Sequence, residues 1–225
     1  MIEHTREGVI HCLAMQNGEN LLEPDFFRVL NEKLDAVEAE SRGDAALVLT
    51  GDGKFFSNGL NLPALGALKS EELSVFARDL RRSMGRLVVF PIPTVAAING
   101  HAFAGGAILA AACDYRIMRE DRGWLCVAEV DVGVPLDPAL MGLLQAKLNP
   151  STLRSCVLEG RRYTGQQALA AGWVDALALE ADLLPAARKH AAGLASKERE
   201  IFSSLKRTLW GTVASQLGYD ARPEA

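Results

Sequence analysis

Residues 98–109 read Ile-Asn-Gly-His-Ala-Phe-Ala-Gly-Gly-Ala-Ile-Leu, and this stretch decides the fold class. An apolar strand is predicted at residues 94–99, and a turn of small residues joins it to an apolar helix predicted at 106–113. The first N–H groups of a helix lack partners within it, and Gly105 and Gly106 let a ligand approach them closely. The turn therefore predicts backbone donors for a developing oxyanion, although tight helix packing through the two glycines explains the turn equally well.

A second segment of interest covers residues 54–62, Lys-Phe-Phe-Ser-Asn-Gly-Leu-Asn-Leu, and follows an apolar strand predicted at 45–50. Bulky apolar side chains flank a small polar centre, and Gly59 permits a backbone shape that other residues resist. The segment can thus expose backbone N–H groups to a ligand, while an ordinary loop between a strand and a helix is the alternative. The glycine turn at residues 98–109 has the spacing of neither a P-loop nor a dinucleotide-binding fingerprint.

Strands and helices alternate along the rest of the chain, and this order predicts an α/β fold. Further strands are predicted at residues 8–15 and 115–119. Further helices are predicted from Pro24 onward and at residues 71–90, 135–148, 151–158, 165–171, 182–195 and 197–217. We expect one core domain over residues 1–175 and a helical C-terminal region over residues 176–225.

The chain has 225 residues, a net charge of −4 and a pI near 5.6. This balance argues against nucleic acid as the main partner, because phosphate binding needs a clustered surplus of Lys and Arg. No apolar run approaches the ~20 residues that span a bilayer. The first residues do not resemble a signal peptide, and residues 222–225 do not match a peroxisomal signal. We therefore expect a cytoplasmic protein. Four widely spaced cysteines are expected to be reduced core thiols: Cys12, Cys113, Cys126 and Cys156.

Three motifs, taken in order, resemble the crotonase (enoyl-CoA hydratase/isomerase) superfamily. Residues 56–62, Phe-Ser-Asn-Gly-Leu-Asn-Leu, are similar to the family's F-S-x-G-x-D-L. The second motif covers residues 99–116 and contains the glycine turn. The third covers residues 163–175 and is similar to T-x-x-E-A-x-x-x-G-L-V-D. Each motif alone is weak, and the three together are strong.

The resemblance implies a crotonase-like spiral of ββα turns, with a helical C-terminal region that forms trimer contacts and a lid over the acyl pocket. It also implies an acyl-CoA thioester as substrate, no metal and no other cofactor, and a homotrimer or a dimer of trimers. The backbone N–H groups of Leu60 and Gly105 are implied to hold the thioester carbonyl. Contacts with CoA are implied for Phe56, Ser57, Asn58, Gly59, Asn61 and Leu62 and, at the CoA phosphates, for Lys206.

The hydratases of this family use two glutamates, and the chain retains one of them. The glutamate expected three residues after the oxyanion glycine is replaced by Ile108, whereas Glu129 matches the other. Glu129 stands among apolar residues, and burial disfavours a charged carboxyl, raises its pKa and makes it a better base. A single base suits an isomerase that carries a proton from C2 of a 3-enoyl-CoA to C4 and yields a 2-enoyl-CoA, in fatty acid degradation.

Two further residues are candidates for a secondary role. Asp131 points the same way as Glu129 if the local chain is extended, and His101 lies at the mouth of the glycine turn. A hydratase, thioesterase, decarboxylase or dehalogenase reaction stays open as an alternative, as does a non-catalytic acyl-CoA-binding protein. The motifs leave the acyl chain length open.

Overall fold

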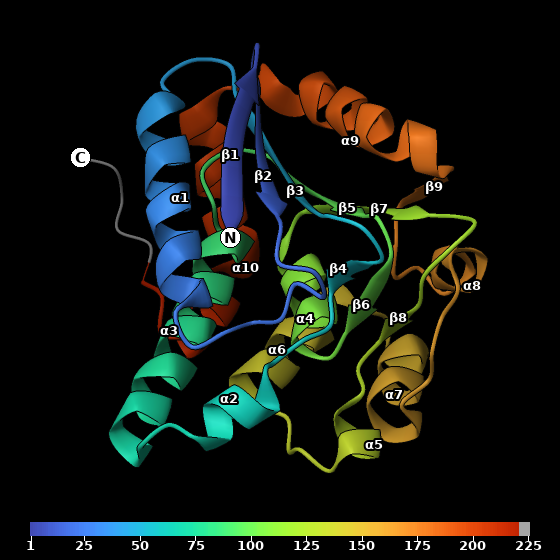
Figure 1. Ribbon diagram of the computed structural model, residues 1–225. Helices are drawn as coiled ribbons and strands as arrows, with labels where there is room; N and C mark the ends of the chain where they lie inside the picture. Colours follow the sequence, from blue (N-terminus) through green and yellow to red (C-terminus); the bar gives the residue numbers. More distant parts are fainter. Residues whose placement is uncertain (221–225) are drawn as a thin grey trace.

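The computed structural model describes residues 1–220 and is built around a six-stranded sheet (Figure 1). The strand order is β1-β2-β3-β5-β7-β9. Strands β1 and β2 pair antiparallel as a hairpin, and every other neighbouring pair is parallel. The six strands are β1 (Ile2–Glu7), β2 (Ile10–Met15), β3 (Ala46–Gly51), β5 (Thr94–Ile98), β7 (Tyr115–Arg119) and β9 (Ala176–Ala178).

A smaller sheet of three parallel strands has the order β4-β6-β8. Its strands are β4 (Phe55–Ser57), β6 (His101–Phe103) and β8 (Leu125–Cys126). Each of them follows a strand of the large sheet and precedes a helix, so β3-β4, β5-β6 and β7-β8 open three successive ββα turns. The expected α/β fold with a spiral of ββα turns is therefore confirmed. Because the three short strands are parallel, their C-terminal ends meet at one edge, where ligands of such folds bind.

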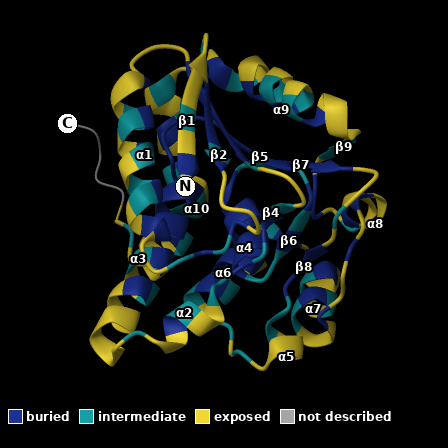
Figure 2. Ribbon diagram, in the orientation of Figure 1, coloured by how far each residue is buried: buried dark blue, intermediate teal, exposed yellow. Residues whose placement is uncertain are grey.

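Helices cover both faces of the large sheet, because the side chains of a strand alternate between its two faces. On β3, Ala46 and Val48 face α9, whereas Leu47 and Leu49 face the larger core that α1 and α3 complete. The inner strands β2, β3, β5 and β7 are largely buried, whereas β1 at the edge of the sheet and the outer helix surfaces are largely exposed (Figure 2). The helices are α1 (Phe26–Glu40), α2 (Leu62–Gly66), α3 (Ser70–Val88), α4 (Gly105–Ala112), α5 (Glu129–Val132), α6 (Pro138–Lys147), α7 (Pro150–Glu159), α8 (Gly165–Ala170), α9 (Glu180–Ala195) and α10 (Arg199–Gln216).

The predicted strands and helices are confirmed, including the six-residue α8, whereas β1 and several shorter elements went unpredicted. The strand predicted at residues 8–15 is β2, preceded by a turn at Gly8 with a φ of +59°. Strand β1 has a largely polar sequence, and β4, β6 and β9 have three residues each, too few to show a period. Helices α2 and α5 are equally short and carry no helical repeat.

The structure also bears on the predictions for the cysteines, for membrane spans and for the domain boundary. All four cysteines are buried free thiols, as predicted. Within residues 1–220 no helix is both long and apolar enough to cross a membrane. Residues 222–225, on which the expected lack of a targeting signal partly depended, lie outside the described residues. The expected boundary after residue 175 falls just before β9, which pairs with β7, and the division into two parts stays a prediction.

Candidate active site

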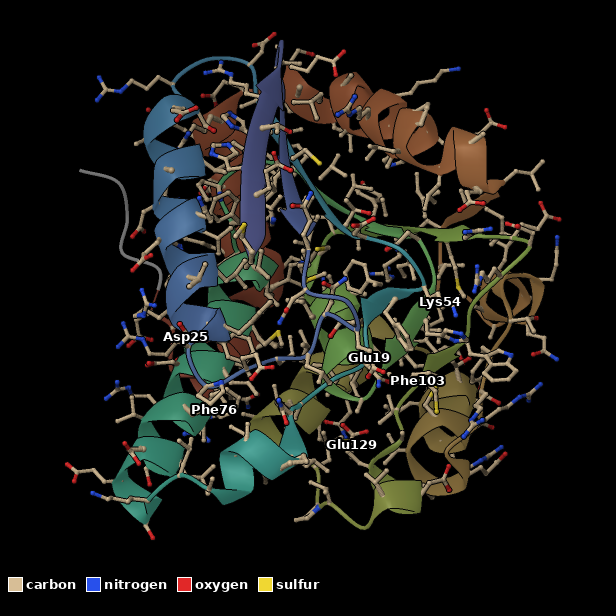
Figure 3. All side chains as sticks on the ribbon, in the orientation of Figure 1. Glu19, Asp25, Lys54, Phe76, Phe103 and Glu129 are labelled. Atoms are coloured by element: carbon tan, nitrogen blue, oxygen red, sulfur yellow. The ribbon has the colours of Figure 1, made fainter. Side chains whose placement is uncertain are left out.

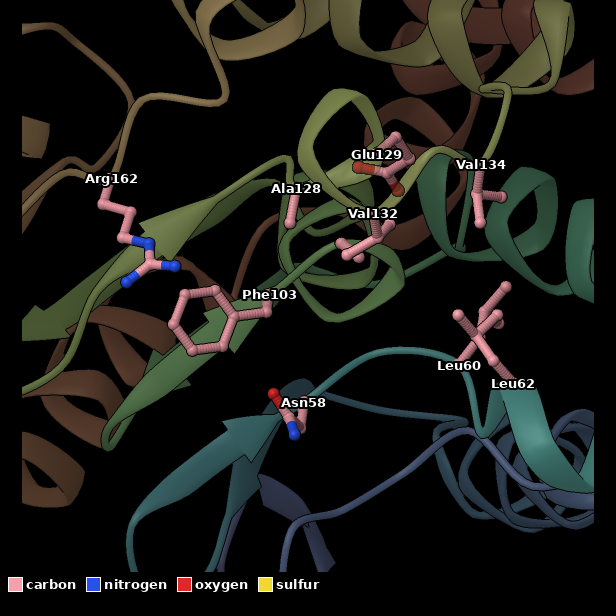
Figure 4. Close-up of a pocket in the computed structure, with 10 residues that line it drawn as sticks. Asn58, Leu60, Leu62, Phe103, Ala128, Glu129, Val132, Val134 and Arg162 are labelled. Atoms are coloured by element: carbon pink, nitrogen blue, oxygen red, sulfur yellow. The ribbon is translucent and has the colours of Figure 1, made fainter.

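A cavity of about 350 Å³ opens where the small sheet ends beside α5 (Figure 4). The cavity is lined by Asn58, Leu60, Leu62, Phe103, Ala104, Ala128, Glu129, Val132, Val134 and Arg162. These residues come from all three turns of the spiral and from the segment before α8. Figure 3 shows Phe103, at the end of β6, and Glu129, at the start of α5, on neighbouring segments. The spiral thus gathers residues that are far apart in the sequence into one mostly apolar pocket.

The two glycine segments lie directly against each other beside the cavity. A Cβ atom on Gly59 would stand 2.9 Å from the carbonyl oxygen of Phe103 and 3.4 Å from the nitrogen of Gly105. A Cβ atom on Gly106 would stand 2.4 Å from the carbonyl oxygen of Ser57. Gly59 also has a φ of +82°, which favours glycine. The glycines are therefore needed for the close approach of two backbones, which supports the packing explanation of the turn, while the ligand-binding explanation stays a prediction.

The backbone N–H groups of Leu60 and Gly105 are not used in the hydrogen bonds of the described chain. Gly105 is the first residue of α4, and a Cβ atom there would lie 3.7 Å from the Leu60 side chain. Ala104 precedes it with φ 48° and ψ −122°, a strained conformation of the kind that clusters at functional sites. Backbone N–H groups without an internal partner are the kind of donor that an oxyanion hole uses, and the assignment of Leu60 and Gly105 to one stays a prediction.

Glu129 supplies the carboxylate of the cavity wall. It is the first residue of α5 and is half-buried, and its buried Oε2 atom has no hydrogen-bond partner among the described residues. Burial raises the pKa of the Glu129 carboxyl above its ordinary value, and a hydrogen bond from its own backbone opposes this shift only in part. The apolar surroundings expected from the flanking residues are only partly present, because Val127 is buried but Val130 is 50% exposed.

Arg162 lines the cavity although no motif indicated it. It lies at the opposite end of the cavity from Leu62 (Figure 4). Its guanidinium carbon lies 5.3 Å from the ring centre of Trp124 and 5.9 Å from that of Phe103. A bridge between Tyr163 and β8 brings this segment to the pocket, and the pairing leaves no local pattern in the sequence. The one available signal is that Arg162 directly precedes the third motif.

The loop residues expected to contact CoA fall into two groups. Asn58 and Leu62 line the cavity, as Leu60 does. Phe56 and Ser57 are fully buried, and the Ser57 hydroxyl donates to the Asn20 carbonyl oxygen at 2.7 Å. The side chains of Phe56 and Ser57 therefore shape the loop from inside, and the predicted contact of these residues with CoA is left to their backbone.

Asn61 takes a structural role at the start of α2. Its side-chain oxygen accepts from the Ala64 N–H at 3.1 Å, and its amide donates to Glu23 at 3.0 Å. The side chain caps the helix and is not part of the cavity wall. The predicted contact of Asn61 with CoA is therefore left to its backbone as well.

Asp131 lies outside the cavity wall. The chain is helical from Glu129 to Val132 and not extended, so successive odd positions do not share a face. The Asp131 carboxylate packs beside Gly160 at the end of α7, where a Cβ atom on Gly160 would stand 2.6 Å from Oδ2. The condition for a second acid beside Glu129 is thus not met.

His101 and Ile108 also lie outside the cavity wall. The His101 ring stacks on Phe103 with ring centres 5.3 Å apart, and its Nδ1 accepts from the Trp124 N–H at 3.3 Å. Burial, assisted by nearby arginines, lowers the pKa of His101. Ile108 is 1% exposed and belongs to the main core. Both residues support the pocket from behind its wall.

Lys206 is not available to CoA phosphates. It is 5% exposed, and its Nζ atom lies 2.8 Å from Oδ2 of Asp114. The same oxygen accepts from the N–H of Thr94 at 2.9 Å and from the Thr94 hydroxyl at 3.0 Å. This buried network ties α10 to the start of β5. The expected phosphate contact is therefore corrected, because the ammonium already has an internal partner.

Comparisons with known proteins identify the family of the chain. The family model for enoyl-CoA hydratase/isomerase matches residues 5–222. The peroxisomal enoyl-CoA delta isomerase 2 of Arabidopsis thaliana is 32% identical, over 96% of this chain and 95% of that protein. Enoyl-CoA delta isomerase 3 of the same plant is 32% identical, over 91% and 90%. A solved enoyl-CoA isomerase from Mycobacterium tuberculosis superposes with a TM-score of 0.88 at 26% identity, over 96% and 94% of the two chains. The chain therefore belongs to the enoyl-CoA hydratase/isomerase family and is an enzyme of that type.

Proposed function

We propose that this enzyme is a 3,2-enoyl-CoA isomerase of fatty acid degradation, in which Glu129 carries a proton from C2 to C4. The observation that carries the proposal is the composition of the cavity wall. Within the described chain, Glu129 is the one carboxylate that lines the cavity, and the positions considered for a second acid lie outside it. A reaction that needs one base is therefore favoured over a reaction that needs two.

The proposed proton transfer begins with the acidity of the substrate. The C2 proton of a 3-enoyl-CoA is acidified by both the thioester and the neighbouring alkene. The Glu129 carboxylate removes this proton, and the electrons move into a dienolate whose oxygen accepts from the N–H groups of Leu60 and Gly105. Those donors are preorganised by the backbone and need no reorganisation during the reaction. The protonated Glu129 then delivers the same proton to C4, which gives the conjugated 2-enoyl-CoA.

The pocket suits this sequence of steps. A raised pKa brings the Glu129 carboxyl closer to the working pH, which strengthens it as a base and keeps it able to return the proton. Apolar walls from Leu60, Leu62, Val132 and Val134 limit access of water to the dienolate. Hydration would need a second group to orient and split water, and the family's position for that group is the buried Ile108.

The proposal is tested by following conjugation of 3-hexenoyl-CoA and hydration of 2-hexenoyl-CoA spectrophotometrically. We expect rapid conjugation of the first substrate and slow or undetectable hydration of the second. If hydration is faster than conjugation, the protein is a hydratase and the assignment as a single-base isomerase is wrong. Release of free CoA would favour a thioesterase, and binding without turnover would favour a non-catalytic acyl-CoA-binding protein.

A homotrimer, or a dimer of trimers, is also proposed. It is supported by an apolar stripe on α10, where Ile201, Leu205 and Leu209 are 61%, 63% and 64% exposed. Residues four apart share one helix face, so this stripe can pack against another subunit. Light scattering should give an oligomer for the wild type, and Leu205→Glu should weaken it, whereas a wild-type monomer would contradict the proposal. A cytoplasmic location stays a prediction.

A further inference from the structure

A cluster of three metal-ligating side chains lies on the N-terminal hairpin, away from the residues that line the active-site cavity. His4 is on β1, His11 is on β2, and Glu40 is the last residue of α1. The antiparallel register pairs Arg6 with His11, so His4, two residues earlier, shares the same sheet face. Nε2 of His4, Nδ1 of His11 and a carboxylate oxygen of Glu40 all lie within 4.8 Å of one another.

The hydrogen bonds around His11 direct a lone pair into this cluster. The imidazole is fully buried, and its Nε2 lies 3.4 Å from the Ser41 hydroxyl oxygen. That hydroxyl donates to the carbonyl oxygen of Val37 at 2.5 Å, so toward His11 it can only accept. His11 therefore carries its proton on Nε2, and Nδ1 presents a lone pair toward Nε2 of His4 at 3.0 Å. A hydrogen-bonded outer partner of this kind is what orients a metal-ligating histidine.

A metal ion fits between these atoms after small movements. Ligand atoms on a tetrahedral Zn²⁺ stand about 3.3 Å apart when each bond is about 2.0–2.1 Å. The two histidine nitrogens, 3.0 Å apart, need to separate only slightly. The Glu40 oxygen lies 4.0 Å from Nδ1 of His11 and needs to move inward, which its 47% exposed side chain permits. Binding would replace the hydrogen bond between the two histidines, with the His4 proton shifting to its other ring nitrogen.

We propose that His4, His11 and Glu40 bind a divalent transition metal, with Zn²⁺ as the expected ion. Two imidazoles and one carboxylate suit Zn²⁺, whereas Mg²⁺ and Ca²⁺ prefer oxygen ligands throughout. The ion would tie the hairpin at the edge of the large sheet to the end of α1. Arg6 opposes binding, because its guanidinium lies 4.0 Å from the Glu40 carboxylate and repels a second cation. We therefore expect the metal ion to bind with moderate affinity and to stabilise the fold. It would take no part in the proposed reaction.

The test measures the melting temperature of the full-length, metal-stripped protein with and without added Zn²⁺. At free Zn²⁺ of about 100 times Kd, linkage raises the melting temperature by about 5–10 °C for a chain of this size. We expect this rise in the wild type and its loss in His4→Gln and Glu40→Gln. Glu32→Gln is the matched control, because Glu32 is exposed on the same helix outside the cluster, and it should keep the rise.

Each comparison is made between the apo and Zn²⁺ forms of one variant, so a change in basal stability does not obscure the result. Substituting Co²⁺ should give visible absorption of a tetrahedral nitrogen and oxygen site without thiolate charge transfer. No rise in the wild type, an undiminished rise in His4→Gln, or a thiolate band would overturn the proposal. The last two outcomes would place the ion elsewhere on the chain.

Discussion

Replacing Glu129 by glutamine removes the proposed base and leaves the shape of the side chain almost unchanged. General acid–base catalysis contributes roughly 10²–10⁴-fold to a rate. Because Glu129 is proposed to act in both proton transfers, we expect kcat for 3-hexenoyl-CoA to fall by about 10³-fold or more. The substrate Kd should change little, since Glu129 is only one part of a mostly apolar wall.

The same substitution should make the protein more stable at neutral pH. The buried Oε2 of ionised Glu129 lacks a partner, and burying an ionised carboxylate costs more than burying the neutral amide that would replace it. Since the side chain is only half-buried, we expect Glu129→Gln to recover about 1 kcal/mol, or about 2–4 °C in melting temperature. The folded-state pKa of Glu129 is raised above its ordinary value of 4.5, so the wild type loses stability as the pH rises through that folded-state pKa. The advantage of the variant should therefore shrink as the pH is lowered toward 4.5 and below.

Kinetics and thermal unfolding, measured on the same samples, test both parts. Asp131→Asn is the control, because Asp131 carries a carboxylate on the same short helix but packs beside Gly160 outside the cavity. It should retain activity within about twofold, since surface substitutions away from a site are small in effect. An active Glu129→Gln enzyme would refute the assignment of the base. A less stable Glu129→Gln protein would refute the argument from burial.

Three further outcomes are expected. As the pH is lowered, kcat/KM should fall with a midpoint above pH 4.5, because Glu129 has a raised pKa and is protonated at a higher pH than an ordinary glutamate. A midpoint at or below pH 4.5 would contradict this. Gly106→Ala should lower the free energy of unfolding by about 1–3 kcal/mol and reduce kcat/KM, because its Cβ would stand 2.4 Å from a backbone oxygen. Gly193→Ala is the control in α9: its Cβ would meet nothing within 4 Å, so it should raise the free energy of unfolding by up to ~1 kcal/mol. Thermal melts distinguish the two. Lys206→Met should remove the cation that pairs with Asp114 and leave that carboxylate only its hydrogen bonds from Thr94, so denaturant titration should show a loss of up to about 3–5 kcal/mol with KM unchanged. A raised KM with unchanged stability would instead favour a contact between Lys206 and the CoA phosphates.

Local patterns in the sequence were sufficient for the long elements and the central motifs. Apolar runs such as residues 45–50 and 94–99 must be buried on both faces, so they predict parallel strands that helices cover. Gly59 and Gly105 also have a local signature, since a glycine between a strand and a helix marks a special backbone. The position of Glu129 followed from the resemblance between motifs, and its apolar neighbours only made the role plausible.

The pocket itself could not be read from the sequence, because long-range pairing assembles it. Arg162 reaches the cavity through the bridge between Tyr163 and β8, and strand pairing of this kind leaves no local period. Phe56 and Ser57 carry the motif but point inward, since the side chains of one loop divide between cavity and core.

The sequence by itself determined the alternation of strands and helices, the two glycine turns and the presence of one matched glutamate. Each of these depends on the chemistry of a few adjacent residues. Only the folded chain shows that Asp131 packs beside Gly160, that Lys206 pairs with Asp114, and that the N–H groups of Leu60 and Gly105 have no partner among the described residues. These features depend on which distant segments pack together. Packing of that kind minimises the free energy of the whole core and leaves no local pattern in the sequence.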